Sequence, residues 1–532
     1  MRKKWLYYWI RVLFLFGIML TIANGAALAQ KRENKFLVIH LDATSSVDLF
    51  RELEAGTLPN IAQFFIDGQE IKYGVSLFPP GTEMIIPRLK RGWDNSQGNP
   101  GWRYYDRETG RAVVGPPVFF GMISQISRLC YHQFWLGAPG LTNIAGLSLL
   151  NIDRVWETHD FAEFYWFHTD VAGHVFGHDI HLDSLKKFDY YFGLAVKAGK
   201  FDGANVVIYC DHGMSMDNVK PIRYQKAISD IVKDNLCYVF YPNIYLHDLT
   251  KKEEYALRIA EETEIDITLI KSLENKITGY IADGSFEINY ADGKYQYTST
   301  GADAFGYNEI GYKGEFLSRD DWLQITKDHL YPGAPPNLFI LMKNDLAGDI
   351  VFVINPPKIP YGFQTPKGHH AGLTNIDLLV PLFLKGPAFE DSESIDIFWL
   401  HELYSKHVPM IDLRAKKSRE NHSLSFRYPL EAELALSPAY RWRGGLVYSE
   451  RGLDPWVEFD LYSSYIARAW VGSILSGNKL GWRLRAEAFL DDFKLSWLQN
   501  ANQEGVLALY WRFHEQAEFI VTKDGMGLSV LF

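Results

Sequence analysis

Cysteine is scarce in this chain, which has only Cys130, Cys210 and Cys237 among its 532 residues. An odd number leaves at least one thiol unpaired, and no two of the three have the short spacing of a cysteine metal site. Low-complexity tracts and internal repeats are also missing, and the composition is 47% hydrophobic and 22% charged, as in globular proteins. Disulfides therefore do not organise the fold.

Basic residues are also fewer than acidic residues. The chain has 54 lysines and arginines against 64 aspartates and glutamates, a net charge of -10. Because phosphate-backbone binding needs clustered lysine and arginine, nucleic acid is not expected as the main partner. A small anionic substrate stays open, since bound cations can dominate the field inside a site.

Long apolar runs are missing except at the N-terminus. There the basic start "MRKKW" leads into "VLFLFGIMLTI" and then "ANGAALAQ", where Ala27-Leu28-Ala29 fits a small-x-small cleavage site. This pattern predicts a signal peptide over 1–29 and an exported, periplasmic or envelope-associated protein. The alternative is an uncleaved membrane anchor with the same consequence for export.

Buried strands are clearly present. Three apolar runs, "KFLVIHLD", "EFYWFHTD" and "GANVVIYCD", end at Asp42, Asp170 and Asp211. Runs of this kind without alternation are typical of parallel sheets covered on both faces, and helical stretches such as "SLKKFDYYFGLAVKAG" separate them. The sequence predicts an α/β fold with a doubly wound, mostly parallel sheet. Ligands of such sheets bind at the carboxyl ends of the strands, where the three aspartates lie.

Patterning changes twice further along the chain. Two Asp-Gly turns between alternating residues predict hairpins within an inserted α+β cap over 214–345. After a linker over 391–422, the alternation in "LSFRYPLEAELAL" and "GWRLRAEAF" predicts an all-β domain over 423–532. One interpretation is a soluble sandwich or open barrel. The other is a small outer-membrane barrel, with envelope association through this β-region and a terminal Phe532 that fits such proteins.

Histidine and carboxylate residues cluster in "HTDVAGHVFGHD", residues 168–179. If the strand ends at Asp170 and the chain turns at Gly173, Asp170 and His174 converge on one cation. His168 is expected deeper on the same strand, supporting the ligands. His178, Asp179 and the nearby His181 are expected to have capping or surface roles.

Two further segments offer metal ligands. Asp211 and His212 are adjacent at a strand end in "CDHGM", and His369 and His370 precede the strand "VPLFLKGP". Carboxylates combined with imidazoles suit zinc, and the oxygen ligands also admit manganese.

Six segments, in their order along the chain, resemble the alkaline phosphatase superfamily, most closely its type I phosphodiesterase/nucleotide pyrophosphatase branch. They are "VIHLD", "GTLPNIAQFFIDG", "LFPPGTEMIIPRLKRG", "DVAGHVFGHD", "DHGM" and the histidine pair before "VPLFLKGP". The resemblance covers residues 35–390, with 214–345 matched only loosely. It implies an alkaline phosphatase-like catalytic domain over 30–390 that hydrolyses phosphodiesters or phosphomonoesters.

The resemblance also implies roles for single residues. Thr82 falls on the nucleophile, which would form a phospho-threonine intermediate, and two divalent ions would be bound. The ligands of one ion would be Asp170, His174 and His370. His369, one position earlier in the sequence, is the alternative to His370. Those of the other ion would be Asp42, Asp211, His212 and the Thr82 oxygen.

The chain departs from this branch around its substrate site. Glu83-Met84-Ile85 follows Thr82 where the branch usually has Phe-Pro-Asn. The asparagine that binds phosphate in the branch has no counterpart in register, so Asn95 and Asn99 are candidates. The sequence therefore does not identify the class of substrate. Two other functions fit: a transferase of phosphoethanolamine or phosphoglycerol groups in the envelope, and a non-catalytic envelope binding or structural protein.

Overall fold

The computed structural model describes residues 32–91, 100–101, 103–113, 131–133, 146–156, 160–216, 218–360, 366–389, 397–407, 422–427, 431–439, 442–449, 452–463, 467–476, 479–490, 493–500, 506–514, 517–522 and 526–531. The predicted signal peptide lies outside these residues. Within them, no helix combines the length and the apolar character needed to cross a membrane.

A six-stranded sheet with the order β2-β19-β7-β1-β6-β5 forms the centre of the first half of the chain. Its strands are β1 (Phe36–Leu41), β2 (Gln69–Val75), β5 (Tyr131–Gln133), β6 (Phe161–Trp166), β7 (Asn205–Tyr209) and β19 (Leu379–Lys385). Strands β5, β6, β1 and β7 are parallel, and β19 runs antiparallel to β7 and β2. Every residue of β1 is buried. The predicted mostly parallel sheet is confirmed.

Helices cover both faces of this sheet, as residues of β6 demonstrate. The covering elements include α2 (Ser46–Glu54), α3 (Pro59–Phe64), α4 (Thr82–Arg91), α8 (His168–Phe176), α9 (His178–Lys197) and α15 (Leu400–His407). On one face, the ring of Phe161 lies 5.3 Å from that of Tyr404 in α15. On the other, Trp166 lies 5.6 Å from Phe188 in α9. The sheet is therefore doubly wound.

The predicted linker over 391–422 differs from the structure in part. Residues 397–407 form a short 3-10 helix, η6 (Ile397–Trp399), and then α15. Leu400 and Leu403 are buried in the same apolar core as the central sheet. The hydroxyl of Tyr404 donates to Glu163 on β6. This stretch therefore belongs to the α/β core, because its apolar side chains cover a face of the sheet.

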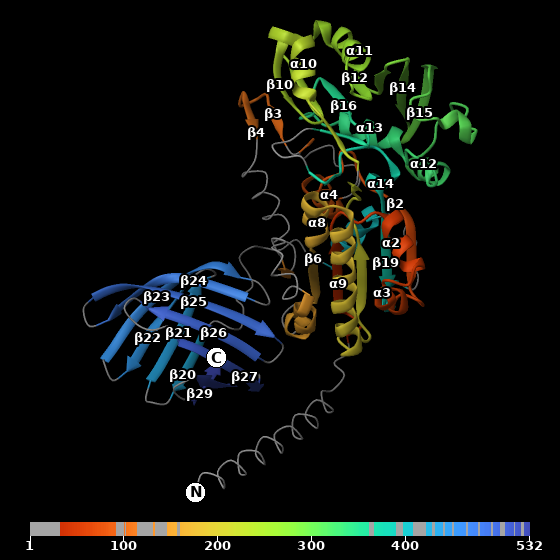
Figure 1. Cartoon of the computed structure of the whole chain (residues 1–532). Helices are drawn as coiled ribbons and strands as arrows, with labels where there is room; N and C mark the ends of the chain where they lie inside the picture. Colours follow the sequence, from red (N-terminus) through yellow and green to blue (C-terminus); the bar gives the residue numbers. More distant parts are fainter. Residues whose placement is uncertain are drawn as a thin grey trace.

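A second, seven-stranded sheet forms the cap, with the order β10-β11-β16-β12-β13-β14-β15. Its strands are β10 (Leu236–Phe240), β11 (Asn243–Leu246), β12 (Ile267–Leu273), β13 (Lys276–Ile281), β14 (Gly284–Ala291), β15 (Lys294–Gly301) and β16 (Ile350–Val353). Helices α10 (Tyr224–Val232), α11 (Lys252–Glu262), α12 (Arg319–Thr326) and α13 (Ala334–Met342) complete this unit. Figure 1 shows it above one end of the central sheet. The second predicted hairpin turns at Asp292 and Gly293, which both have positive φ.

The C-terminal strands form a closed antiparallel barrel in which β20 pairs with β29. They are β20 (His422–Arg427), β21 (Glu431–Ala439), β22 (Trp442–Ser449), β23 (Gly452–Ser463), β24 (Ala467–Ser476), β25 (Lys479–Leu490), β26 (Phe493–Asn500), β27 (Val506–His514), β28 (Ala517–Thr522) and β29 (Met526–Leu531). The all-β prediction is confirmed, and the sheet closes on itself rather than forming a sandwich. The barrel strands are drawn in blue in Figure 1.

Candidate metal centre

Two neighbouring strands bring the first two carboxylates together. β1 and β7 are parallel and adjacent, and Asp42 and Asp211 follow their carboxyl ends. Both side chains are fully buried. The chain turns sharply after Asp42, since Ala43 has a φ of 51° and its N–H donates to Asp211 Oδ1 at 3.4 Å. The strand-end position predicted for these two aspartates is what the structure has.

Asp170 and His174 lie on a helix, which corrects the predicted strand end and tight turn. β6 ends at Trp166, and both residues fall on α8, four positions apart on one helical face. His174 Nε2 lies 3.3 Å from Asp170 Oδ1. Gly173 has a packing role instead of a turn role, because a Cβ there would lie 2.4 Å from Met214 Sδ.

His370 reaches the same cluster from the loop after β18 (Gly368–His369). Its Nε2 lies 3.5 Å from Asp170 Oδ1, and its ring stacks on His212 with the centroids 3.8 Å apart. His369 sits on β18, with its ring edge-on to His174, and its Nδ1 has no hydrogen-bond partner among the described residues. Of the two histidines left open by the sequence, His370 is the one whose Nε2 faces Asp170.

The three cluster imidazoles share one hydrogen-bonding pattern. The Nδ1 of each donates to a main-chain carbonyl, His174 to Gly368 (2.8 Å), His212 to Gly213 (2.9 Å) and His370 to Pro80 (2.7 Å). A carbonyl only accepts, so the proton of a neutral ring is on Nδ1 and Nε2 is a lone-pair acceptor.

That pattern leaves acceptor atoms facing one another. His174 Nε2 lies 3.1 Å from His370 Nε2, and both lie within 3.5 Å of Asp170 Oδ1. Asp170 Oδ1 is buried and accepts no hydrogen bond from the described residues. Acceptors converging without a donor are stabilised by a cation, and imidazole nitrogens with a carboxylate oxygen are the donor set that zinc prefers.

The remaining groups extend this metal-type geometry. The ligand atoms of Asp170, His174 and His370 lie within 4.8 Å of one another. The same holds for two further sets, which are His40 with Asp42 and Asp211, and Asp42 with Asp170 and His212. Chemically, the donors therefore fit two neighbouring divalent ions.

Thr82 is the first residue of α4 and is buried beside the carboxylates. Its Oγ1 lies 3.4 Å from Asp42 Oδ1 and 3.4 Å from His212 Nε2. A helix N-terminus also presents unpaired N–H groups and a partial positive charge to an anion. The hydroxyl therefore stands where the carboxylates, an imidazole and a helix end meet.

The other members of the 168–179 cluster lie elsewhere. His168 is on α8, and its Nδ1 contacts Ser184 Oγ on α9 at 2.8 Å, so the predicted position deeper on a shared strand face is wrong. His178 and Asp179 begin α9, and Asp179 is exposed, in line with a surface role. His181 is fully buried against the Thr169 carbonyl, which corrects the predicted capping or surface role. Asn95 and Asn99 lie outside the described residues.

Three residues in or beside the cluster were not predicted from the sequence, namely His40, Tyr165 and Asp377. His40 stacks between the rings of Tyr165 and Tyr209, with its Nε2 3.0 Å from Asp211 Oδ1. The Tyr165 hydroxyl donates to Asp42 Oδ2 and leaves Asp42 Oδ1 facing Thr82. His40 lies on β1, two residues before Asp42 at the end of that strand, and this spacing was the available signal.

Asp377 is the third group, and it fixes the loops that carry two of the histidines. Its buried carboxylate accepts from Gly372 N at 2.7 Å and from Ser215 Oγ at 2.8 Å. Its main-chain carbonyl accepts from Gly213 N at 2.9 Å. Asp377 therefore joins the loop after His212 to the loop after His370. None of these hydrogen bonds involves either imidazole.

Replacing Asp377 with alanine is expected to weaken zinc binding roughly 10- to 100-fold, the range typical of residues that orient metal ligands. The loops holding His212 and His370 would lose their shared anchor. Competition with a chelator measures the affinity, with Asp283→Asn as a control because Asp283 is an exposed carboxylate of the cap. Unchanged affinity in Asp377→Ala would show that the loops hold their shape without it.

Burial and mutual repulsion perturb the ionisation of the cluster. Burial, together with the charges of Asp211 and Asp170, raises the pKa of Asp42 well above its usual value. Burial alone would raise the pKa of Asp170, but the neighbouring His174 and His370 hold it well below the usual range. Burial alone would lower the pKa of His174, but the Asp170 carboxylate raises it. The metal-free cluster therefore retains protons that a cation must displace.

Metal uptake is accordingly expected to release protons, and more of them at pH 6 than at pH 8. His174, whose pKa is raised, is protonated at pH 6 and becomes neutral as the pH rises, while Asp42 keeps its proton to a higher pH than an ordinary carboxyl. Zinc affinity should therefore increase with pH through neutrality. Calorimetry in buffers of different ionisation enthalpy counts the protons, and an equal count at both pH values would contradict the assignment of His174.

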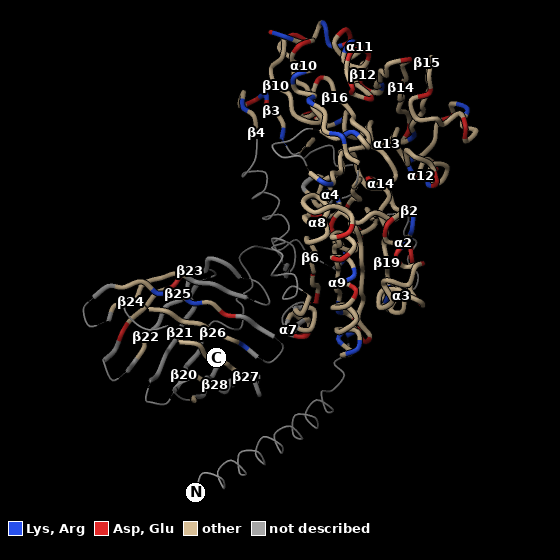
Figure 2. Tube along the Cα trace, in the orientation of Figure 1, with Lys and Arg blue, Asp and Glu red and all other residues tan. Residues whose placement is uncertain are grey.

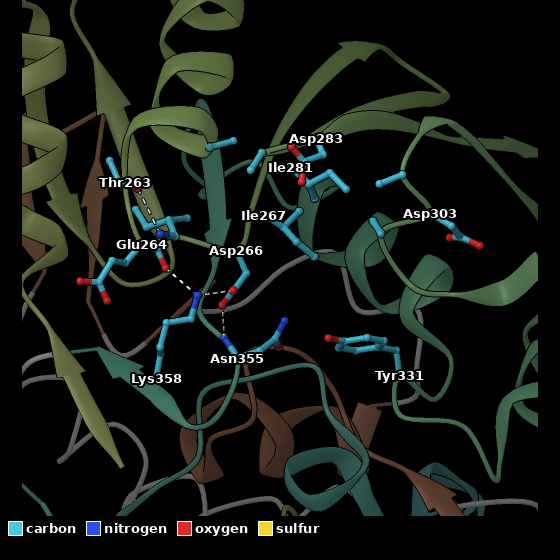
Figure 3. Close-up of a pocket in the computed structure, with 15 residues that line it drawn as sticks. Thr263, Glu264, Asp266, Ile267, Ile281, Asp283, Asp303, Tyr331, Asn355 and Lys358 are labelled. Carbon is cyan, nitrogen blue, oxygen red and sulfur yellow. Dashed lines mark hydrogen bonds and ion pairs between the residues drawn. The ribbon is translucent and has the colours of Figure 1, made fainter. Parts of the chain in front are cut away.

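The cap contains a separate surface hollow, shown in Figure 3, in which several of the charged groups contact one another or neighbouring polar groups. Lys358 Nζ donates to Asp266 and to the Glu264 carbonyl, and Asn355 N donates to Asp266 Oδ2. Asp303 accepts from the Tyr297 hydroxyl. This hollow therefore offers no counterpart to the converging acceptors of the strand-end cluster.

Comparison with known proteins gives similarities of fold. No protein-family model matches the chain, and no curated protein matches its sequence. Murine ectonucleotide pyrophosphatase/phosphodiesterase 5 is similar at 13% identity and a TM-score of 0.44, over 72% of this chain and 97% of that one. Phosphonoacetate hydrolase from Sinorhizobium meliloti is similar at 14% and 0.39, over 71% and 96%. Alkaline phosphatase PafA is similar at 11% and 0.42, over 72% and 96%. At such identities no residue role is transferred to this chain.

Proposed function

We propose that the chain is an exported, metal-dependent hydrolase of phosphodiesters or phosphomonoesters that works through a phospho-threonine on Thr82. The observation that carries the proposal is the position of the Thr82 hydroxyl. It lies 3.4 Å from both Asp42 Oδ1 and His212 Nε2, beside imidazole and carboxylate acceptors that face one another without a donor. Export rests on the predicted signal peptide.

Two divalent ions, zinc or alternatively manganese, would be held by the two halves of the cluster. Asp170, His174 and His370 would bind one ion. Asp42, Asp211, His212 and Thr82 Oγ1 would bind the other, with His40 supporting Asp211. When bound, such ions lower the pKa of a ligating hydroxyl and neutralise charge on a phosphoryl group.

The residues of the chain would then divide the reaction into two steps. Thr82 Oγ1 attacks phosphorus, forming an O–P bond while the ester bond breaks and the alcohol leaves. Water attacks the phospho-threonine, releasing phosphate or a monoester and restoring the hydroxyl. The N-terminus of α4, on which Thr82 sits, favours the negative charge that accumulates in both steps. Tyr165 keeps Asp42 oriented throughout through its hydrogen bond to Oδ2.

Hydrolysis of two model esters tests this proposal. The full chain, loaded with zinc or with manganese, is assayed on bis-p-nitrophenyl phosphate and on p-nitrophenyl phosphate. Turnover of either ester supports a hydrolase, and the ratio of the two rates decides between a diesterase and a monoesterase. Bound metal without turnover of either ester would contradict hydrolysis.

A further inference from the structure

The outer face of the C-terminal barrel is predominantly apolar where its side chains are described, with the half-buried Ser473 and Gln499 as polar exceptions. Every exposed residue in this part of the structure is apolar, and these residues are Leu446, Pro455, Val457, Leu475, Trp482, Ala486, Leu495, Trp497, Leu507, Leu509, Val521 and Met526. Several are large and substantially exposed, among them Trp482 at 48% and Leu507 at 55%. The outer face of a soluble barrel would carry polar side chains at such positions.

The interior is mixed, and it holds the charged groups that the outer face lacks. Its buried apolar residues include Trp456, Ile474 and Tyr510. On either side of Gly472 in β24, Arg483 of β25 donates to Glu458 of β23, and both charged side chains are fully buried. Arg485 lies 3.5 Å from Glu458 and 3.8 Å from Glu487. The Arg483 guanidinium stacks over Trp456 at 4.4 Å. Ion pairs inside and apolar side chains outside invert the arrangement of a water-soluble domain.

We propose that the barrel is embedded in a lipid bilayer through this outer face. Closed antiparallel barrels with an even number of strands, an apolar exterior and a polar interior are the β-structures that span membranes. The ten strands β20 to β29 close on themselves. β23, β24 and β25, with 12, 10 and 12 residues, have the length that a tilted strand needs to cross the hydrocarbon layer.

A dimer interface with a second copy of the chain explains this outer face less well than lipid does. The exposed apolar residues come from each of the strands β22 to β29, so they follow the described part of the barrel around most of its circumference. A dimer covers one side of a barrel, whereas lipid surrounds it. In Figure 2 the coloured parts of the barrel strands are tan with a few red and blue segments, whereas charged positions are frequent on the helices of the cap.

Flotation with vesicles of dilauroylphosphatidylcholine tests the proposal on the full chain. The chain is expected to assemble into the vesicles and to float with them after washing with high salt and carbonate. Single outward arginines, Leu475→Arg, Leu495→Arg and Leu509→Arg, are then compared by urea unfolding in the vesicles. The most deeply placed of the three is expected to lower the folded-to-unfolded ratio roughly 30-fold or more.

The matched control is Ile66→Arg. Ile66 is 83% exposed on the α/β unit, so the same change of side chain there should alter neither flotation nor unfolding. An exposed leucine in a soluble barrel would also tolerate arginine with little effect. Detergent-free solubility of the full chain as a monomer or a closed oligomer, without flotation, would overturn the proposal. So would three arginine variants that all unfold like the parent in vesicles. Neither outcome bears on Thr82 or the metal cluster.

Discussion

Thr82→Ala is expected to reduce the hydrolysis of bis-p-nitrophenyl phosphate or p-nitrophenyl phosphate roughly 10³-fold or more, while most of the bound metal is retained. The size follows from removing a nucleophile whose role no neighbouring group duplicates. Thr82 Oγ1 lies beside a cluster of carboxylates and imidazoles, and those donors would still hold the ions without it. Loss of turnover and retention of metal thus separate the nucleophile from the ligands.

Two further variants make the comparison specific. Thr82→Ser keeps a hydroxyl and is expected to recover part of the activity. Thr57→Ala removes a hydroxyl that bonds to Glu52 at the end of α2, away from the cluster, and should leave turnover unchanged. Metal content by elemental analysis and initial rates are measured for all three. Activity of Thr82→Ala within tenfold of the parent would remove Thr82 from the reaction.

Asp170→Asn is expected to lower the metal content from two ions per chain to one or fewer, and turnover by roughly 10³-fold or more. Asp170 Oδ1 faces both His174 Nε2 and His370 Nε2, and the carboxylate also groups with Asp42 and His212. Removing its charge therefore affects both halves of the cluster.

Misfolding as the source of such a loss is measured directly. In the metal-free protein the neighbouring His174 and His370 hold the pKa of Asp170 well below its usual range despite its burial, so the ionised carboxylate stabilises the fold at neutral pH. The metal-free Asp170→Asn chain is therefore expected to unfold at a lower temperature than the metal-free parent, and metal content and turnover are measured well below that temperature. Asp179→Asn, an exposed acid in the same segment, serves as the control. Full metal content and full turnover in Asp170→Asn would contradict its place at the centre of the site.

The central sheet was predictable because its strands are continuous apolar runs that end at acidic residues. β1 is buried on both faces, and a strand in that position must consist of apolar side chains almost throughout. The positions of Asp42 and Asp211 followed directly. Asp170 was misplaced because β6 passes into α8 through a short segment that has no helix-capping residue, since Phe167 at the N-cap makes no side-chain hydrogen bond.

The strands of the barrel could be predicted from the sequence, but which of their side chains point inward could not. Alternation in "GWRLRAEAF" separates Trp482 and Leu484 from Arg483 and Arg485, and a soluble domain would bury the apolar set. Alternation alone does not say which face points inward. Closure of β20 on β29 places Arg483 and Arg485 inside, and that pairing joins strands at opposite ends of the domain.

The most direct test of the central claim is a titration of the metal-stripped full chain with zinc. At each step, bound metal is measured by elemental analysis, and the hydrolysis of bis-p-nitrophenyl phosphate and p-nitrophenyl phosphate is measured alongside it. The claim is that the buried cluster around Thr82 is a two-metal hydrolytic site. It predicts no hydrolysis without metal and a rise in rate that levels off once two ions are bound per chain. Hydrolysis at the full rate in the presence of a chelator, or two bound ions with no hydrolysis, would contradict it.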